Sequence, residues 1–116
     1  MDQLQISAKF PSIPSENVES FKKLAGECVE VVREKDPGTL QYDWFLSADG
    51  SQCIVRETYA SSDDMMAHMG NLGDLLGQLV ELGGALEVEV FGAPSEELQE
   101  AAAAFEPAVY AHFLSK

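Results

Sequence analysis

The chain has 116 residues, the size of a single domain that can bury one hydrophobic core. Its formal net charge of -13 argues against nonspecific binding to nucleic acid or to an anionic membrane, because those partners need clustered Lys and Arg. No apolar run is long enough to span a membrane, no signal sequence is recognisable, and the two cysteines lack metal-site spacing. We therefore expect one acidic, cytoplasmic domain over residues 1–116, without a metal site.

The first third of the chain predicts a strand followed by a helix. Apolar and polar residues alternate over residues 4–10, which is typical of a strand with one buried face. Ser15 is placed to cap a helix whose apolar stripe runs from Val18 to Val32 at helical spacing. The Asp-Pro-Gly sequence at residues 36–38 ends that helix, because proline cannot continue it.

Residues 40–47 and 52–59 predict a β-hairpin around the Asp49-Gly50 turn, because both runs are rich in aromatic and β-branched residues. A loop over residues 48–51 puts four pairs on one face: Leu46 with Cys53, Trp44 with Val55, Tyr42 with Glu57, and Leu40 with Tyr59. The opposite face carries Phe45 with Ile54, Gln41 with Thr58, and an expected ion pair of Asp43 with Arg56.

Glu57 is the most unusual residue of the predicted hairpin. It falls on the apolar face beside Tyr42, Trp44 and Tyr59. A carboxylate in such a place must be hydrogen-bonded, paired or protonated, since burying it bare costs several kcal/mol. Glu57 is therefore a candidate functional group.

A helix that carries a histidine is expected directly after the hairpin. Residues 61–64 have the spacing of a capping box. Met65, His68 and Met69 then lie at helical spacing along one face. Because glycine weakens a helix, we expect a bend or break near Gly70.

The rest of the chain predicts a second helical segment, a fourth strand and a C-terminal extension. The helical segment runs over residues 72–82, and apolar and charged residues then alternate over residues 86–90. The extension, residues 92–116, is expected to hold a short helix that runs through the alanines at 101–104 and a short strand over residues 109–114. The core of the domain is then residues 4–91, and the extension gives no functional hint.

The order βαββαβ predicts an α+β, ferredoxin-like fold, an antiparallel sheet with helices on one face. The other face carries Phe45, Ile54 and Phe91 among polar residues, so it is too apolar to stay uncovered. We expect a second copy of the chain to cover it, which gives a two-fold homodimer through the sheet.

One set of residues resembles the antibiotic biosynthesis monooxygenase (ABM) family: Gly38-Thr39-Leu40-Gln41-Tyr42, then Trp44, then Glu57-Thr58-Tyr59, then His68. The resemblance covers residues 4–91 and implies a dimeric α+β barrel. Some members of that family oxidise aromatic polyketides or quinols with molecular oxygen and use no metal, flavin or haem. The resemblance thus implies a cofactor-independent monooxygenase that acts on a quinol or polycyclic phenol.

Two residues are the catalytic candidates of such an enzyme. His68 would be the base or proton shuttle, because its reference pKa is near neutrality. Glu57 would orient the imidazole or stabilise its charged form. The candidate substrate-binding residues are aromatic groups that stack and donate hydrogen bonds, and methionines that shape an apolar wall: Trp44, Tyr42, Tyr59, Met65 and Met69.

Other interpretations remain open at this stage. Each of these residues can instead be an ordinary core residue, and a hydrogen bond between Glu57 and His68 or a tyrosine needs no catalysis. A non-catalytic dimer that binds a small apolar molecule or serves in a stress response fits the same features. A haem-binding relative with His68 as axial ligand is a third alternative.

Overall fold

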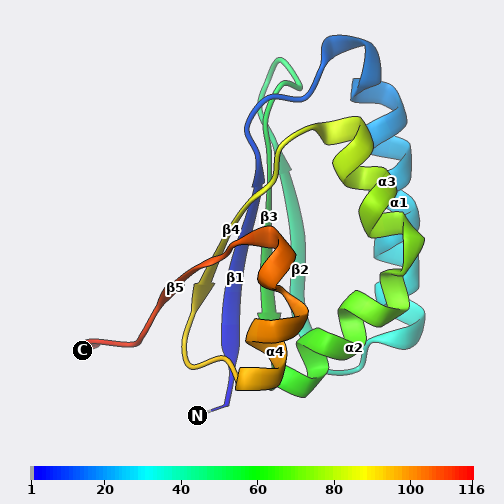
Figure 1. Cartoon of the computed structure of the whole chain (residues 1–116). Helices are drawn as coiled ribbons and strands as arrows, with labels where there is room; N and C mark the ends of the chain where they lie inside the picture. Colours follow the sequence, from blue (N-terminus) through cyan, green and yellow to red (C-terminus); the bar gives the residue numbers. More distant parts are fainter. Residues whose placement is uncertain (1) are drawn as a thin grey trace.

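The computed structural model describes residues 2–116 as a five-stranded sheet with helices packed on one face (Figure 1). The α-helices and strands, in chain order, are β1 (Leu4–Phe10), α1 (Val18–Lys35), β2 (Thr39–Leu46), β3 (Cys53–Tyr59), α2 (Ser62–Leu72), α3 (Asp74–Gly83), β4 (Glu87–Phe91), α4 (Glu96–Ala101) and β5 (Ala108–Tyr110). Two short 3-10 helices, η1 (Ser15–Asn17) and η2 (Ala103–Phe105), precede α1 and follow α4.

The strand order is β2-β3-β1-β4-β5, and the first four strands are antiparallel to their neighbours. This arrangement confirms the predicted α+β, ferredoxin-like fold. The fifth strand pairs with β4 in parallel, so the sheet is mixed, and within one chain it is open. β5 ends at Tyr110, whereas the sequence predicted a strand over residues 109–114. None of the helices formed by residues 2–116 combines the length and apolarity needed to cross a membrane.

The hairpin has the predicted register along most of its length. Trp44 lies opposite Val55, and Tyr42 lies opposite Glu57. The expected pair of Leu40 with Tyr59 is wrong, because a bulge between Thr39 and Gln41 shifts the register and puts Thr39 opposite Tyr59. Leu40 is consequently 56% exposed.

The expected ion pair of the hairpin does not form. Asp43 and Arg56, both in the described part of the chain, lie opposite each other, but no ion pair joins them. Instead, Oδ2 of Asp43 accepts a hydrogen bond of 3.0 Å from Nε2 of Gln41 on the same strand. Both side chains point to solvent, where a single ion pair contributes little stability.

Two helix-end predictions also differ from the structure. Ser15 caps no helix, because it begins η1 and its side chain makes no cap hydrogen bond there. The break in the second helical region lies at Gly73, whose φ of 54° favours glycine, and Gly70 stays inside α2. The predicted cap at Ser61 is confirmed, since its hydroxyl accepts a hydrogen bond from the Asp64 backbone N–H at 3.2 Å.

The core lies between the sheet and the helices in two parts. The first packs α1 and α3 on the middle strands and contains Phe10, Phe21, Cys28, Val55 and Leu79. The second joins β1, β3 and β4 to α2 and α4, and contains Leu4, Ile6, Tyr59, Met65, Val90 and Leu98. Leu98 is 2% exposed, so the α4 part of the C-terminal extension packs into the fold, whereas Phe113 and Leu114 near its end are exposed.

Candidate functional site

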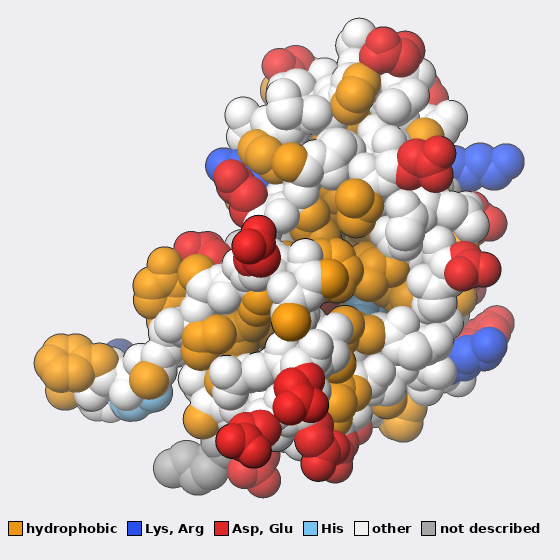
Figure 2. Space-filling model, viewed as in Figure 1, with side chains coloured by type: hydrophobic (Ala, Val, Ile, Leu, Met, Phe, Trp, Pro, Cys, Tyr) orange, Lys and Arg blue, Asp and Glu red, His pale blue; other side chains and the backbone are white. Residues whose placement is uncertain are grey.

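A largely apolar cavity lies between the sheet and the α2–α3 region. It leaves about 80 Å³ for the centres of water-sized molecules, several times the roughly 10–15 Å³ that one water needs. Figure 2 shows hydrophobic side chains around an opening on this side of the molecule. Six of the seven residues predicted for the site line this cavity: Tyr42, Trp44, Glu57, Met65, His68 and Met69.

His68 is carried into the cavity by helix α2. Ser61 caps the start of this helix, and Met65 and His68 lie three positions apart on its buried face, which packs against the sheet. The His68 side chain is 6% exposed, and its Nδ1 lies 2.7 Å from Oδ2 of Asp36. Burial lowers the pKa of His68, while the hydrogen bond and charge of Asp36 act in the opposite direction.

Asp36 follows the last residue of α1 and is a polar site residue that the sequence did not reveal, as is its hydrogen-bond partner Asn71. In the sequence Asp36 stands only as part of the helix stop at residues 36–38. Its position could have marked it as unusual, because an acid at the C-terminus of a helix interacts unfavourably with the helix dipole. Gly38 allows the close approach to α2, because a Cβ there would overlap the Asp64 side chain.

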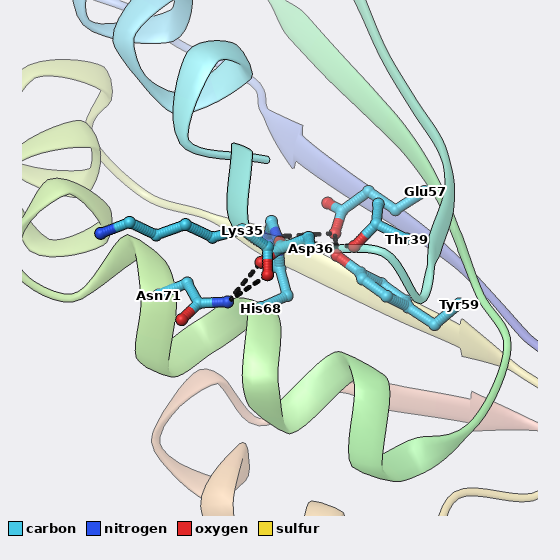
Figure 3. Close-up of polar contacts among 7 residues, drawn as sticks. All are labelled: Lys35, Asp36, Thr39, Glu57, Tyr59, His68 and Asn71. Carbon is cyan, nitrogen blue, oxygen red and sulfur yellow. Dashed lines mark hydrogen bonds and ion pairs between the residues drawn. The ribbon is translucent and has the colours of Figure 1, made fainter. Parts of the chain in front are cut away.

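The buried Asp36 carboxyl group is surrounded by hydrogen-bond partners (Figure 3). The Asn71 side-chain amide donates to Oδ1. The Thr39 hydroxyl donates to Oδ2 at 3.4 Å, the atom that also contacts the imidazole of His68. These contacts satisfy an acid that would otherwise be costly to bury.

Glu57 lies on β3, on the other side of the imidazole. Its Oε1 is 3.9 Å from Nε2 of His68, and Oε1 also accepts a short hydrogen bond from the hydroxyl of Tyr59. Burial raises the pKa of Glu57 to about 7, although the Tyr59 hydrogen bond acts against this rise. Glu57 and His68 therefore face each other, but they are too far apart for a direct hydrogen bond.

The three predicted aromatic residues have different positions. Tyr42 and Trp44 line the cavity edge-to-face, with ring centroids 5.7 Å apart. Burial and the neighbouring Glu57 raise the pKa of Tyr42, so its hydroxyl stays protonated at neutral pH. Tyr59 does not line the cavity, in contrast to the prediction. It is fully buried in the second core cluster and contacts Glu57 from behind.

One buried hydrogen-bond donor at the cavity has no acceptor. Among side chains of residues 2–116, Nε1 of Trp44 is the only buried nitrogen or oxygen atom without a partner. Leaving such a group unpaired costs about 1–3 kcal/mol. An acceptor oxygen that reached the indole N–H would remove this cost.

The C-terminal extension forms one wall of the cavity. Ala102, Phe105 and Pro107 contribute to the lining, opposite the sheet residues. This role could not be predicted from the sequence, because the wall residues are small or apolar and form no recognisable motif. The site is thus built from both ends of the chain.

Among the described residues, neither the two cysteines nor a metal-binding cluster adds chemistry near this site. Burial raises the pKa of both Cys28 and Cys53 to about 11, so these thiols stay protonated at neutral pH and are poor nucleophiles. Within residues 2–116, no three His, Cys, Asp or Glu side chains are arranged to hold a metal ion.

Several solved structures are similar in fold to this chain. MupZ from Pseudomonas fluorescens is 21% identical, the match covers 98% of this chain and 92% of that one, and the TM-score is 0.79. A putative antibiotic biosynthesis monooxygenase from Caulobacter crescentus is 21% identical over 81% and 92%, with a TM-score of 0.70. Rv0793 from Mycobacterium tuberculosis is 23% identical over 81% and 97%, with a TM-score of 0.69.

The comparisons of sequence agree with the fold. A search of curated proteins gives no match. A family model described as antibiotic biosynthesis monooxygenase matches residues 6–73, which is more than half of the chain and includes the hairpin, Asp36 and His68. This chain belongs to the antibiotic biosynthesis monooxygenase family.

Proposed function

We propose that this protein is a cofactor-independent monooxygenase that oxidises a quinol or polycyclic phenol with molecular oxygen. The observation that carries the proposal is the apolar cavity into which His68 and Glu57 project from opposite sides. A flat aromatic substrate suits such lining, and polar groups at one end would fix its hydroxyl. The family membership supports the same class of reaction.

His68 is the proposed base. Burial lowers its pKa, so the imidazole is neutral at neutral pH and can accept a proton. Nδ1 is already engaged by Asp36, which leaves Nε2 as the accepting atom. Substrate deprotonation there would produce an electron-rich phenolate in a cavity whose lining is largely apolar.

The space between His68 and Glu57 is the proposed position of the substrate hydroxyl. Nε2 and Oε1 are 3.9 Å apart, so one oxygen atom between them can lie within roughly 3 Å of both. The hydroxyl proton would pass to Nε2. Glu57, whose pKa is about 7, can donate to the same oxygen when it is protonated.

The proposed reaction needs no reductant besides the substrate. The phenolate supplies electrons to dioxygen, and a carbon–oxygen bond forms at a ring carbon that bears hydrogen. The oxygen–oxygen bond then breaks, one oxygen stays as the second carbonyl of a quinone, and the other leaves as water. The water carries the former hydroxyl proton, returned from His68, and the hydrogen from the ring carbon. Tyr42 and Trp44 would hold the ring, and Met65 and Met69 would form its apolar wall.

A homodimer through the open face of the sheet is part of the proposal. Phe45 is 57% exposed and Phe91 37% exposed on that face, and Phe91 stacks on Tyr110 with centroids 5.6 Å apart. Such an apolar surface is expected to be covered by a second copy. Light scattering should give the mass of two chains at micromolar concentration, and Phe45→Asp should give the mass of one. We assign the dimer to the cytoplasm, which keeps Cys28 and Cys53 as free thiols.

An oxygen electrode and a panel of naphthols and quinols test the catalytic proposal. We expect one dioxygen consumed for each quinone formed above the rate without protein, and one atom of 18O in the quinone when 18O2 is supplied. His68→Ala should lower this rate by roughly 100-fold or more, the usual contribution of a general base. His112→Ala is the matched control, because His112 is exposed in the C-terminal tail and should leave the rate unchanged.

Two results would contradict the proposal. Unchanged oxygen consumption in His68→Ala would remove His68 from the mechanism. No oxygen consumption with any compound, together with binding of the same compounds, would favour a non-catalytic dimer that holds a small apolar molecule.

A further inference from the structure

We propose that Asp36 is the positioning residue of the site: it holds the neutral imidazole of His68 with the proton on Nδ1 and the lone pair of Nε2 toward Glu57. The catalytic part of this inference rests on the proposed function, but the position of the ring proton does not, and it can be measured without turnover.

The first step is the contact between the two residues. Nδ1 of His68 and Oδ2 of Asp36 are 2.7 Å apart, and the side chains are 6% and 1% exposed. A hydrogen bond screened from water is stronger than one at the surface. Since a carboxylate only accepts hydrogen bonds, Nδ1 must be the nitrogen that carries the proton.

The second step is that Asp36 is itself held in place. The amide of Asn71 donates both to Oδ1 of Asp36 and to the backbone oxygen of Lys35, the latter at 3.2 Å. The backbone oxygen of Asp36 accepts from the Thr39 N–H at 3.1 Å. Figure 3 shows Asp36 between Asn71 and His68, with the Lys35 ammonium directed away from the group. The carboxyl group therefore cannot turn away from the imidazole without losing the hydrogen bond from Asn71, and the bonds to the backbone oxygens of Lys35 and Asp36 fix the backbone that carries it.

The third step separates the roles of the two acids. The sequence assigned the orientation of the imidazole to Glu57. Oε1 of Glu57, however, accepts from Tyr59 and is 3.9 Å from Nε2, which is too long to orient the ring. Each ring nitrogen therefore faces a different acid: Nδ1 is bonded to Asp36, and Nε2 is left for the substrate.

The variant Asp36→Asn reverses the expected proton position for a geometric reason. Asn71 donates to Oδ1, so the new amide should keep its oxygen on that side. Its NH2 group then replaces Oδ2 and donates to Nδ1 of His68. The ring must place its proton on Nε2, which removes the accepting lone pair from the cavity.

Nitrogen NMR of protein labelled with 15N-histidine tests the inference. The neutral His68 ring should show a protonated Nδ1 and an unprotonated Nε2 in the wild type, and the opposite assignment in Asp36→Asn. His112 is the internal reference, and Asp74→Asn, at the exposed first residue of α3, is the matched control. A wild type with the proton on Nε2 would overturn the inference, and this measurement needs no variant to fold.

Kinetics separate this inference from the proposed function. With a substrate of the panel, Asp36→Asn should lower kcat by roughly 100-fold and change KM little, because the variant removes the base and not the binding surface. The rise of kcat with pH on the acidic side, where His68 loses its proton, should also disappear. The titratable neighbours of His68 are Asp36, Glu57, Tyr42 and Tyr59. An active protein whose kcat and His68 proton position are unchanged in Asp36→Asn contradicts the inference alone. A protein with the expected tautomer and no turnover contradicts the proposed function alone.

Discussion

Replacing Glu57 with Gln should remove a dependence of stability on pH. The pKa of Glu57 rises from an ordinary 4.5 to about 7 in the folded protein because the side chain is buried. At about 1.4 kcal/mol for each pKa unit, this difference corresponds to about 3 kcal/mol. Because the folded pKa is the higher one, the stability is fully present below pH 4.5 and is lost as the pH rises through about 7.

The glutamine variant keeps the shape and the acceptor of the site. Its Oε1 can still accept from the Tyr59 hydroxyl, and it has no charge to desolvate at any pH. Wild type and Glu57→Gln should therefore have similar free energies of unfolding near pH 5. At pH 8 the variant should be more stable by about 2–3 kcal/mol.

Urea unfolding followed by far-UV circular dichroism, from pH 5 to 8.5 at one protein concentration, measures this difference. His68 contributes in the opposite direction, since its lowered pKa costs stability at acidic pH, but it is present in both proteins and cancels in the comparison. Glu34→Gln, on the exposed side of α1, is the matched control and should run parallel to wild type. If the Glu57→Gln curve also ran parallel, Glu57 would not titrate as its burial requires.

Two further predictions concern the backbone and the cavity wall. Gly73→Ala should lower the free energy of unfolding by about 1–2 kcal/mol, because φ is 54° there. Gly70→Ala lies inside α2, where an added Cβ meets no neighbour, and should raise the free energy of unfolding by about 0.5–1 kcal/mol. Thermal unfolding measures both variants, and equal effects would contradict the assignment of the helix break. Phe105→Ala should enlarge the cavity and shift the substrate preference toward larger ring systems. The measurement is the ratio of kcat/KM for a larger and a smaller ring system of the panel. An unchanged ratio would show that the C-terminal wall does not select the substrate.

The sequence predicts the hairpin well because its information is local. Alternating side chains and the Asp49-Gly50 turn are enough to pair Tyr42 with Glu57, and so to identify an acid on the apolar face. The bulge at Leu40 has no such local signal. Likewise, Gly70 and Gly73 look alike in the sequence, and only the packed structure decides which of them takes the positive φ.

The candidate site was predictable only in part. His68 and Glu57 were found, because each is a polar residue in an apolar pattern. Asp36 was not, since it contacts His68 across 32 positions of the chain, and its neighbours Pro37 and Gly38 explain it equally well as a helix end. Tyr59 was assigned to the substrate because it shares a face with Glu57, but its ring lies in the core and its hydroxyl is used by that acid.

The position of Trp44 has a practical consequence. It is the only tryptophan of the chain and it lines the cavity, where its indole N–H lacks an acceptor. Indole emission responds to the polarity around the ring, so the protein carries an intrinsic optical reporter at the place where a ligand would sit. Titration of the emission with unreactive compounds can rank occupants of the cavity before any turnover is known.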